Sequence, residues 1–344
     1  MPRLKRVDCS TPGIRRRRVG RGFAYFHGDL RVTDPEVLAR IRALAIPPAW
    51  TDVWICPLAT GHIQAVGTDA AGRKQYRYHD AWRARRDQEK FDHMVEFARA
   101  LPALRGVIAA DLLGQELSRR RVLACAARLL DIGFFRIGTE GYAEQNQSYG
   151  LATIQKRHVR LVDGGVRFDY VAKSGKRRIQ SVVDPEVYAV VEALKRRRGG
   201  GPDLLAYRED GRWHDVRSAD INAYIKDATG SDFSAKDFRT WNATVLAAVS
   251  LAVSIEARTP TARKRAISYA MTSVAHWLGN TPAVCRASYV DPRVVDRYLA
   301  GVTIAPALSL LGETAEFGHL STQGAIEQAV LDLLEEAPPA ARVA

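Results

Sequence analysis

A change of sequence period near residue 79 is the feature that most constrains the fold. Residues 22–78 contain short runs of alternating apolar and polar residues separated by turn signals, a pattern typical of β-strands. From residue 79 onward, apolar residues mostly recur at helical spacing. We therefore expect an α+β protein, with a small N-terminal β-rich domain over residues 21–85 and a larger, mainly α-helical domain over residues 86–344.

One β island interrupts the helical part. Residues 153–182 form three strand-like runs, and Asp163-Gly164-Gly165 between the first two is a hairpin signal. This pattern predicts a three-stranded β-sheet inserted into the helical domain, with Lys173 at the tip of the second turn. From Pro185 to about Leu334 we expect helices again, separated by prolines.

The charge of the chain points to a polyanionic partner. Lys and Arg number 51 against 38 Asp and Glu, which gives a net charge of +13, and an excess this large is typical of nucleic-acid binding. Basic residues crowd the start of the chain, so residues 1–20 are expected to form a flexible basic arm. After residue 302 the sign reverses, and this acidic tail is expected to lie away from the binding surface.

Cysteine and hydropathy patterns exclude several classes of protein. Four cysteines lie far apart without a C-x-x-C pair, which argues against a metal site and against a disulfide framework and favours a reducing cytoplasm. Apolar runs are all shorter than the ~18 residues that a membrane span needs. We therefore expect a cytoplasmic protein with no membrane partner and no bound metal.

A stretch near residue 280 joins two candidate site residues. Residues 274–292 predict a helix that ends at Gly279, a break, and a short second element that carries Tyr289. Asn280 follows the glycine, where a turn exposes its side chain. Taken alone, Tyr289 reads as an ordinary structural residue, so its role depends on the rest of the chain.

Cations elsewhere in the chain indicate a chemical role for Tyr289. They lie in an apolar segment, at the predicted β-turn and at a predicted helix start: Arg136, Lys173, Lys236 and Arg239. A phenol with a pKa of about 10 is largely protonated at pH 7 and needs cations to favour the phenolate. Arginines can donate paired hydrogen bonds to phosphate oxygens, and a lysine can protonate a leaving oxygen, a general-acid role that contributes about 10²–10⁴-fold. Each cation alone has an ordinary structural reading, but together they predict transfer of a phosphodiester to Tyr289, with Asn280 as a neutral donor.

These residues and their surrounding motifs resemble the type IB DNA topoisomerases, in particular their small poxvirus-like bacterial subgroup. The resemblance covers roughly residues 20 to 300. Its motifs are Gly72–Tyr78, Phe134–Gly138, Asn146–Thr153, Phe168–Lys176 and Lys236–Thr240, together with Leu278-Gly279-Asn280 and Tyr289.

The resemblance implies an activity and a set of roles. Such an enzyme clamps double-stranded DNA between a β-rich and a helical catalytic domain, and nicks one strand through a 3′-phosphotyrosyl link at Tyr289. It then allows rotation and religates without ATP, a cofactor or an obligatory metal. Arg136, Arg239 and Asn280 would hold the phosphate, and Lys173 would act as general acid. A monomer associated with the nucleoid is expected.

The resemblance also assigns residues to DNA binding. They lie on the strand-like segment before residue 79 and beside the predicted catalytic arginine: Arg73, Lys74, Gln75, Tyr76, Tyr78 and Lys236. Gln75, Tyr76 and Tyr78 would contact the major groove, and Lys236 would approach the scissile phosphate. One position departs from the wider family, in which most members carry histidine where Asn280 stands. An asparagine still donates a hydrogen bond, but it cannot titrate.

Two other classes of protein remain open at this stage. A tyrosine recombinase shares the Arg, Lys, Arg and Tyr chemistry, but it is expected to carry a histidine three residues before the second arginine, where Lys236 stands. Recombinases also usually have a helical N-terminal domain. A non-catalytic basic DNA-binding protein would leave the convergence of five site residues to chance.

Overall fold

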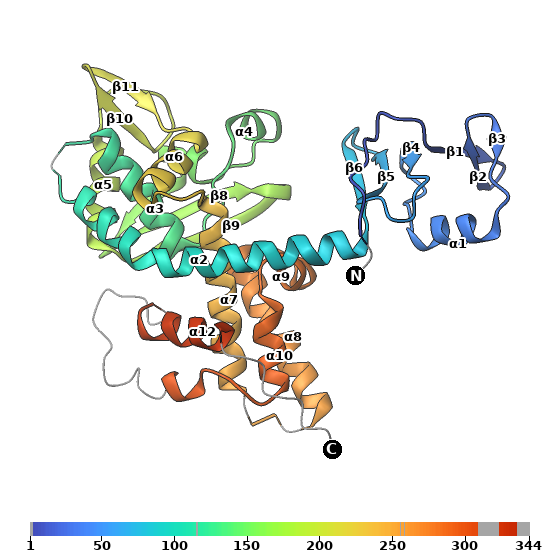
Figure 1. Ribbon diagram of the computed structural model, residues 1–344. Helices are drawn as coiled ribbons and strands as arrows, with labels where there is room; N and C mark the ends of the chain where they lie inside the picture. Colours follow the sequence, from blue (N-terminus) through green and yellow to red (C-terminus); the bar gives the residue numbers. More distant parts are fainter. Residues whose placement is uncertain (1–2, 115, 255, 258, 309–322, 336–344) are drawn as a thin grey trace. The chain divides into compact units, whose positions relative to one another are not determined.

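The computed structural model describes residues 3–114, 116–254, 256–257, 259–308 and 323–335 (Figure 1). The chain divides into two compact units, Met1–Phe91 and Asp92–Ala344. The first contains a six-stranded sheet, and the second is mainly helical with a three-stranded sheet, which confirms the predicted α+β class. The expected boundary after residue 85 falls inside helix α2 (Asp80–Leu112), which continues from the first unit into the second.

The first unit is an antiparallel sheet with one short helix. Its strands follow the order β3-β2-β1-β4-β5-β6, and α1 (Pro35–Ala43) lies between β3 and β4 in the chain. The strands are β1 (Ile14–Val19), β2 (Gly22–His27), β3 (Leu30–Arg31), β4 (Thr51–Ile55), β5 (Ile63–Thr68) and β6 (Lys74–Tyr78). Asp34 caps α1 as the sequence suggests, because its carboxylate accepts hydrogen bonds from the backbone of Glu36 and Val37.

The two faces of this sheet bury separate apolar clusters. Ile41 of α1 packs with Ile14, Val53, Ile55 and Ala65 on one face. The opposite face buries a cluster of Trp54, Cys56 and Val66, which Val7 and Cys9 help to cover. The segment before β1 is thus part of the core of this unit.

The prediction of a flexible arm over residues 1–20 is therefore wrong. Residues 14–19 form β1, which pairs with both β2 and β4. Arg16 donates hydrogen bonds to backbone carbonyls of Pro47 and Trp50, and Lys5 forms a β-bridge with Gly61. The charge pattern misled because an arginine-rich strand can keep its charged groups at the surface while its backbone completes a sheet.

The second unit consists mainly of helices, and a three-stranded sheet packs against some of them (Figure 1). The sheet has the order β7-β8-β9 and consists of β7 (Val159–Val162), β8 (Gly165–Ala172) and β9 (Lys176–Val182). Its helices up to residue 253, besides the end of α2, are α3 (Arg119–Gly133), α4 (Glu140–Asn146), α5 (Pro185–Arg196), α6 (Ser218–Thr229) and α7 (Ala235–Val253). The inserted sheet and its first hairpin turn match the prediction, and Gly164 takes the left-handed conformation (φ 71°) that the turn requires.

One hairpin contradicts the expectation of helices throughout residues 185–334. Strands β10 (Ala206–Glu209) and β11 (Arg212–Asp215) pair antiparallel. Asp210 and Gly211 between them both have positive φ, the conformation of a two-residue hairpin turn that Asp-Gly favours. The turn signal was thus present in the sequence.

The C-terminal part of this unit carries the predicted helix and break. Helix α8 (Pro260–Leu278) ends at Gly279, whose φ of 64° forms a left-handed cap, and α9 (Pro282–Ser288) leads to Tyr289. After α10 (Pro292–Leu299), α12 (Ala325–Glu335) packs Ile326, Val330 and Leu333 inward. Glu327 of α12 also binds Arg105 and the indole N–H of Trp241. Residues 325–335 of the acidic tail thus pack as an amphipathic helix, while its residues 309–322 and 336–344 lie outside the described ones.

Candidate active site

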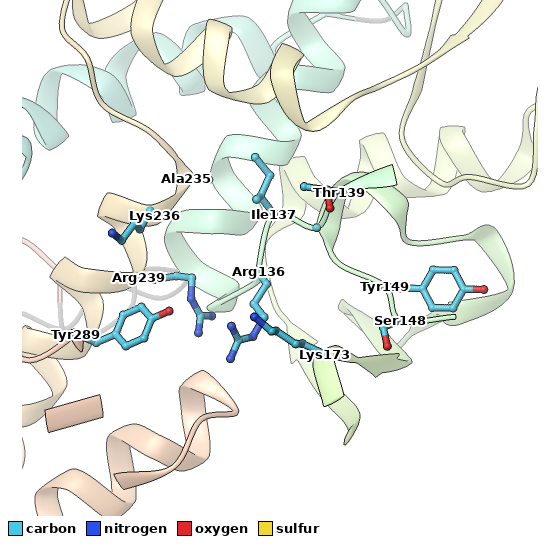
Figure 2. A pocket seen from close by; sticks show the side chains of 11 residues that line it. Arg136, Ile137, Thr139, Ser148, Tyr149, Lys173, Ala235, Lys236, Arg239 and Tyr289 are labelled. Carbon is cyan, nitrogen blue, oxygen red and sulfur yellow. The ribbon is translucent and has the colours of Figure 1, made fainter. Parts of the chain in front are cut away.

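Five of the six predicted site residues in the second unit line one cleft. The cleft has a volume of about 270 Å³, and no acidic side chain lines it among the residues that the structure describes. Its lining comprises Arg136, Ile137, Gly138, Thr139, Ser148, Tyr149, Lys173, Ala235, Lys236, Arg239 and Tyr289. Figure 2 shows the hydroxyl of Tyr289 pointing toward the guanidinium groups of Arg239 and Arg136.

Two unusual backbone features place Arg136. Phe134 caps α3 in the left-handed conformation (φ 55°), which turns the chain sharply after the helix. The backbone then runs beside residues 150–152, where Leu151 N–H donates to the carbonyl of Arg136 at 2.8 Å. Gly138 and Gly150 permit this approach, because a Cβ on Gly138 would lie 2.7 Å from the Cα of Gly150. These contacts fix the backbone of Arg136.

Arg239 is buried in the second turn of α7, only 5% exposed. Its guanidinium donates to the carbonyl of Phe134 at 2.7 Å and to that of Leu278 at 3.0 Å. Its central carbon lies 5.3 Å from the ring centroid of Tyr289. One side chain therefore joins the turn before Arg136, the end of α8 and the tyrosine.

Asn280 lies beside the cleft at the end of α8 and meets Arg136. Its side-chain Oδ1 accepts a hydrogen bond from Nη2 of Arg136, which also reaches the carbonyl of Gly279 at 3.5 Å. Its Nδ2 is buried and has no hydrogen-bond partner in the described part of the chain. A buried N–H without an acceptor is costly, so this donor is suited to a ligand oxygen.

Positive charge is in excess at this site. Burial lowers the pKa of Arg239 to about 10, and the charge of Arg136 acts in the same direction. Burial acts to raise the pKa of Tyr289, but the charges of Arg239 and Arg136 outweigh it, so the pKa falls below its ordinary value. The site therefore favours an anion at the tyrosine oxygen and between the two arginines.

The two lysines of the site, unlike its arginines, are exposed. Lys173 is exposed in a one-turn 3₁₀ segment, Lys173–Gly175, at the tip between β8 and β9 where the sequence places it. Lys236 is exposed in the first turn of α7. In the regions that the structure describes, neither ammonium group has an ion-pair or hydrogen-bond partner.

Comparison with known proteins settles the family. Residues 79–300 match the catalytic core of eukaryotic DNA topoisomerase I, and residues 22–69 match the N-terminal domain of bacterial DNA topoisomerase IB. The chain belongs to the type IB DNA topoisomerases. It is 33% identical over 294 residues to the DNA topoisomerase 1B of Acanthamoeba polyphaga mimivirus, with 83% of this chain and 87% of the relative covered. A second relative, the DNA topoisomerase 1 of Daucus carota, is 24% identical over 160 residues, which cover 46% of this chain and 19% of the relative.

Family membership excludes the two other classes of protein that the sequence left open, a tyrosine recombinase and a non-catalytic DNA-binding protein. None of the described helices is long and apolar enough to cross a membrane. The described residues also contain no group of three His, Cys, Asp or Glu side chains that could hold a metal ion.

Five of the six residues assigned to DNA binding, all except Lys236, lie on β6 or in the turn before it. Tyr76 and Tyr78 are partly exposed on one face, with stacked rings 6.0 Å apart, while Gln75 lies on the other face, as the alternation predicts. Arg73 forms an ion pair with Asp69, and the amide of Gln75 donates to the same carboxylate at 3.0 Å. Hydrogen bonds to its carboxylate, of which the one from the backbone N–H of Arg73 has the largest effect, lower the pKa of Asp69 to about 2. Lys74 is exposed.

Sequence reasoning missed Arg178, a cation that lies near the candidate active site of the second unit. Arg178 of β9 binds the carbonyls of His276 and Trp277 at the end of α8. It belongs to the basic run Lys176–Arg178, whose first two members are exposed. A single sequence gives no signal that separates the third from them, because its partners lie about a hundred residues away.

Proposed function

We propose that this type IB topoisomerase relaxes supercoiled duplex DNA by transferring one strand to Tyr289 and back. The cleft, which no acidic side chain lines among the described residues, brings two guanidiniums to a tyrosine hydroxyl, and the amide N–H group of Asn280 beside it has no acceptor among those residues. This arrangement is the observation that carries the proposal. A DNA phosphodiester supplies the anion that this arrangement lacks. Two fixed arginines provide charge that a metal ion would otherwise supply.

In the cleavage step, the Tyr289 oxygen attacks the scissile phosphorus and loses its proton to water. A 3′-phosphotyrosyl bond forms as the bond from phosphorus to the 5′ oxygen breaks, and the ammonium of Lys173 gives that oxygen a proton. Arg136, Arg239 and Nδ2 of Asn280 donate hydrogen bonds to the nonbridging oxygens, whose negative charge grows in the transition state.

Religation is the reverse of this step. The free 5′ hydroxyl attacks the phosphotyrosyl phosphorus and returns its proton to Lys173, while the tyrosine oxygen leaves and takes a proton from water. One phosphodiester replaces another, so the cycle consumes no ATP. Lys236 approaches the scissile phosphate, and the exposed groups of β6 contact the major groove. A monomer acting on nucleoid DNA is sufficient for this cycle.

Plasmid relaxation tests the proposal directly. The purified protein should relax negatively supercoiled plasmid in the presence of EDTA and in the absence of ATP. The matched variant Tyr289→Phe removes only the nucleophilic oxygen, and should bind the plasmid without relaxing it. A wild-type protein that binds but does not relax the plasmid would overturn the proposal, as would relaxation by Tyr289→Phe.

A further inference from the structure

The C-terminus of α8 is held by three guanidinium groups from distant parts of the second unit. The carbonyls of residues 276 to 279 are four consecutive acceptors. Arg178 binds the first two at 2.9 and 2.6 Å, Arg239 binds the third at 3.0 Å, and Arg136 approaches the fourth at 3.5 Å. A helix C-terminus leaves such carbonyls without helical partners and carries partial negative charge, so it attracts cations.

Arg178 differs from the other two arginines because it does not line the cleft. Its side chain is half-buried, and burial lowers its pKa. No carboxylate pairs with it among the described residues, and its guanidinium donates to the backbone carbonyls of His276 and Trp277 and to the side-chain oxygen of Gln180. Its side chain packs against Gly279, where a Cβ would lie 3.2 Å from the Cδ of Arg178. The contact places Arg178 directly against the turn that carries Asn280.

Strand β9 also holds the helix that leads to Arg136. Gln180 donates from its amide to the carbonyl of Gly133, the last residue of α3, at 2.6 Å. Its amide oxygen accepts from Arg178 at 3.1 Å. One short chain of hydrogen bonds therefore joins the end of α3, which precedes Arg136, to the end of α8, which precedes Asn280.

We infer that Arg178 is a positioning residue for DNA cleavage. It holds the end of α8 so that the amide of Asn280 faces the phosphate that Arg136 binds. Without this residue, two terminal carbonyls of α8 lose their cation, and the turn at Gly279 loses the side chain against which it packs. The inference rests on the proposed role of Asn280, and it adds a residue that acts only through Asn280.

The test compares neighbouring arginines under enzyme excess. Supercoiled plasmid is mixed with saturating protein, the reaction is quenched with SDS, and the rate of covalent adduct formation is measured. Arg178→Ala should slow this rate by up to about 100-fold, because small displacements of catalytic groups cost that much. The control is Arg177→Ala, which removes an equal charge from the neighbouring residue. Arg177 forms only a surface ion pair with Asp169, so this variant should stay within about twofold of the wild-type rate.

A double-mutant cycle separates positioning from a general structural role. Once Asn280→Ala has removed the donor, adding Arg178→Ala should cost only about twofold more, since the two residues act on one contact. Thermal unfolding of each variant shows whether it is folded. If Arg178→Ala does not fold, Arg178→Lys replaces it in the cycle, because a lysine offers a single point charge where arginine binds two carbonyls in a fixed geometry.

The outcomes distinguish this inference from the proposed function. A wild-type protein that forms no adduct overturns the proposed function itself. A normal wild-type rate with equal rates for Arg178→Ala and Arg177→Ala overturns the positioning role alone. So does a full, additive loss in the Asn280→Ala background, because a residue that acts through Asn280 cannot slow a reaction that no longer uses it.

Discussion

The arginines and the lysines of the cleft are held in opposite ways. Arg239 is buried and Arg136 half-buried, and backbone carbonyls near the ends of α3 and α8 bind both guanidiniums. Lys173 and Lys236 are exposed on a turn and on the first turn of a helix. Fixed charges suit a phosphate whose position does not change during the reaction, because they need no reorganisation. A mobile ammonium suits an oxygen that departs and returns.

Lys173 gives the largest expected effect and tests the mobile side of the comparison. Lys173→Ala should slow cleavage by about 10²–10⁴-fold at saturating protein, because the leaving oxygen loses its proton donor. Lys173→Arg keeps the charge, but arginine does not release its proton near neutral pH, so it should remain nearly as slow. Single-turnover adduct formation measures both. A fast Lys173→Arg enzyme would show that charge alone is needed, which contradicts the general-acid role.

Substitution of Arg239 tests the role of the fixed arginines in this comparison. Arg239→Ala should slow cleavage by about 10²–10³-fold, the usual loss when one preorganised donor is removed. Arg239→Lys should recover little of it, because an ammonium cannot reach phosphate and backbone carbonyls in the same geometry. The carbonyls of Phe134 and Leu278 would lose their partner, so Arg239→Ala should also lower the free energy of unfolding by about 1–3 kcal/mol. Urea unfolding measures this loss, and a wild-type rate for Arg239→Lys would contradict the account.

The tyrosine reports the fixed charges through its pKa. Cations favour the phenolate, so the pKa of Tyr289 in the free protein should lie below the ordinary value of about 10. The ultraviolet difference titration of wild type minus Tyr289→Phe isolates this group from the other tyrosines. Arg136→Ala should raise the pKa, because one favourable charge is lost while the burial that opposes ionisation remains. A pKa unchanged by Arg136→Ala would show that the guanidinium does not act on the phenol.

Lys74 of the first unit gives the smallest expected effect. If its exposed ammonium meets a DNA phosphate, Lys74→Ala should weaken binding on all sequences and reduce the slope of log affinity against log salt by about 1. The cleavage rate at saturating protein should not change, because Lys74 takes no part in the chemistry. Binding titrations at several salt concentrations measure the slope. An unchanged slope would remove Lys74 from the DNA contacts.

Much of the site was predictable because its residues lie at recognisable local signals. Gly279 marks the end of α8, and Pro282 begins α9, so Asn280 and Tyr289 were placed on the correct turn and element. Alternation along β6 separated Gln75 from Tyr76. These signals need only a few neighbouring residues.

Long-range pairing accounts for what the sequence did not reveal. In the sequence, Arg16 is one of a run of arginines that suggests an exposed segment. In the structure its backbone pairs with β2, and its guanidinium donates to a carbonyl about thirty residues away. Arg178 likewise depends on carbonyls of α8. Asp69 forms an ion pair with Arg73 and accepts a hydrogen bond from Gln75. Both contacts depend on the geometry of the turn, which motif matching does not show.

Mapping the covalent link tests the central claim most directly. Wild-type protein is trapped on plasmid DNA with SDS, the DNA is digested, and the modified peptide is identified by mass spectrometry. We predict that the nucleotide is attached to Tyr289 through a 3′-phosphoryl group, and that the nicked strand has a free 5′ hydroxyl that polynucleotide kinase can label. Attachment to another residue, or a link through a 5′-phosphate, would contradict it.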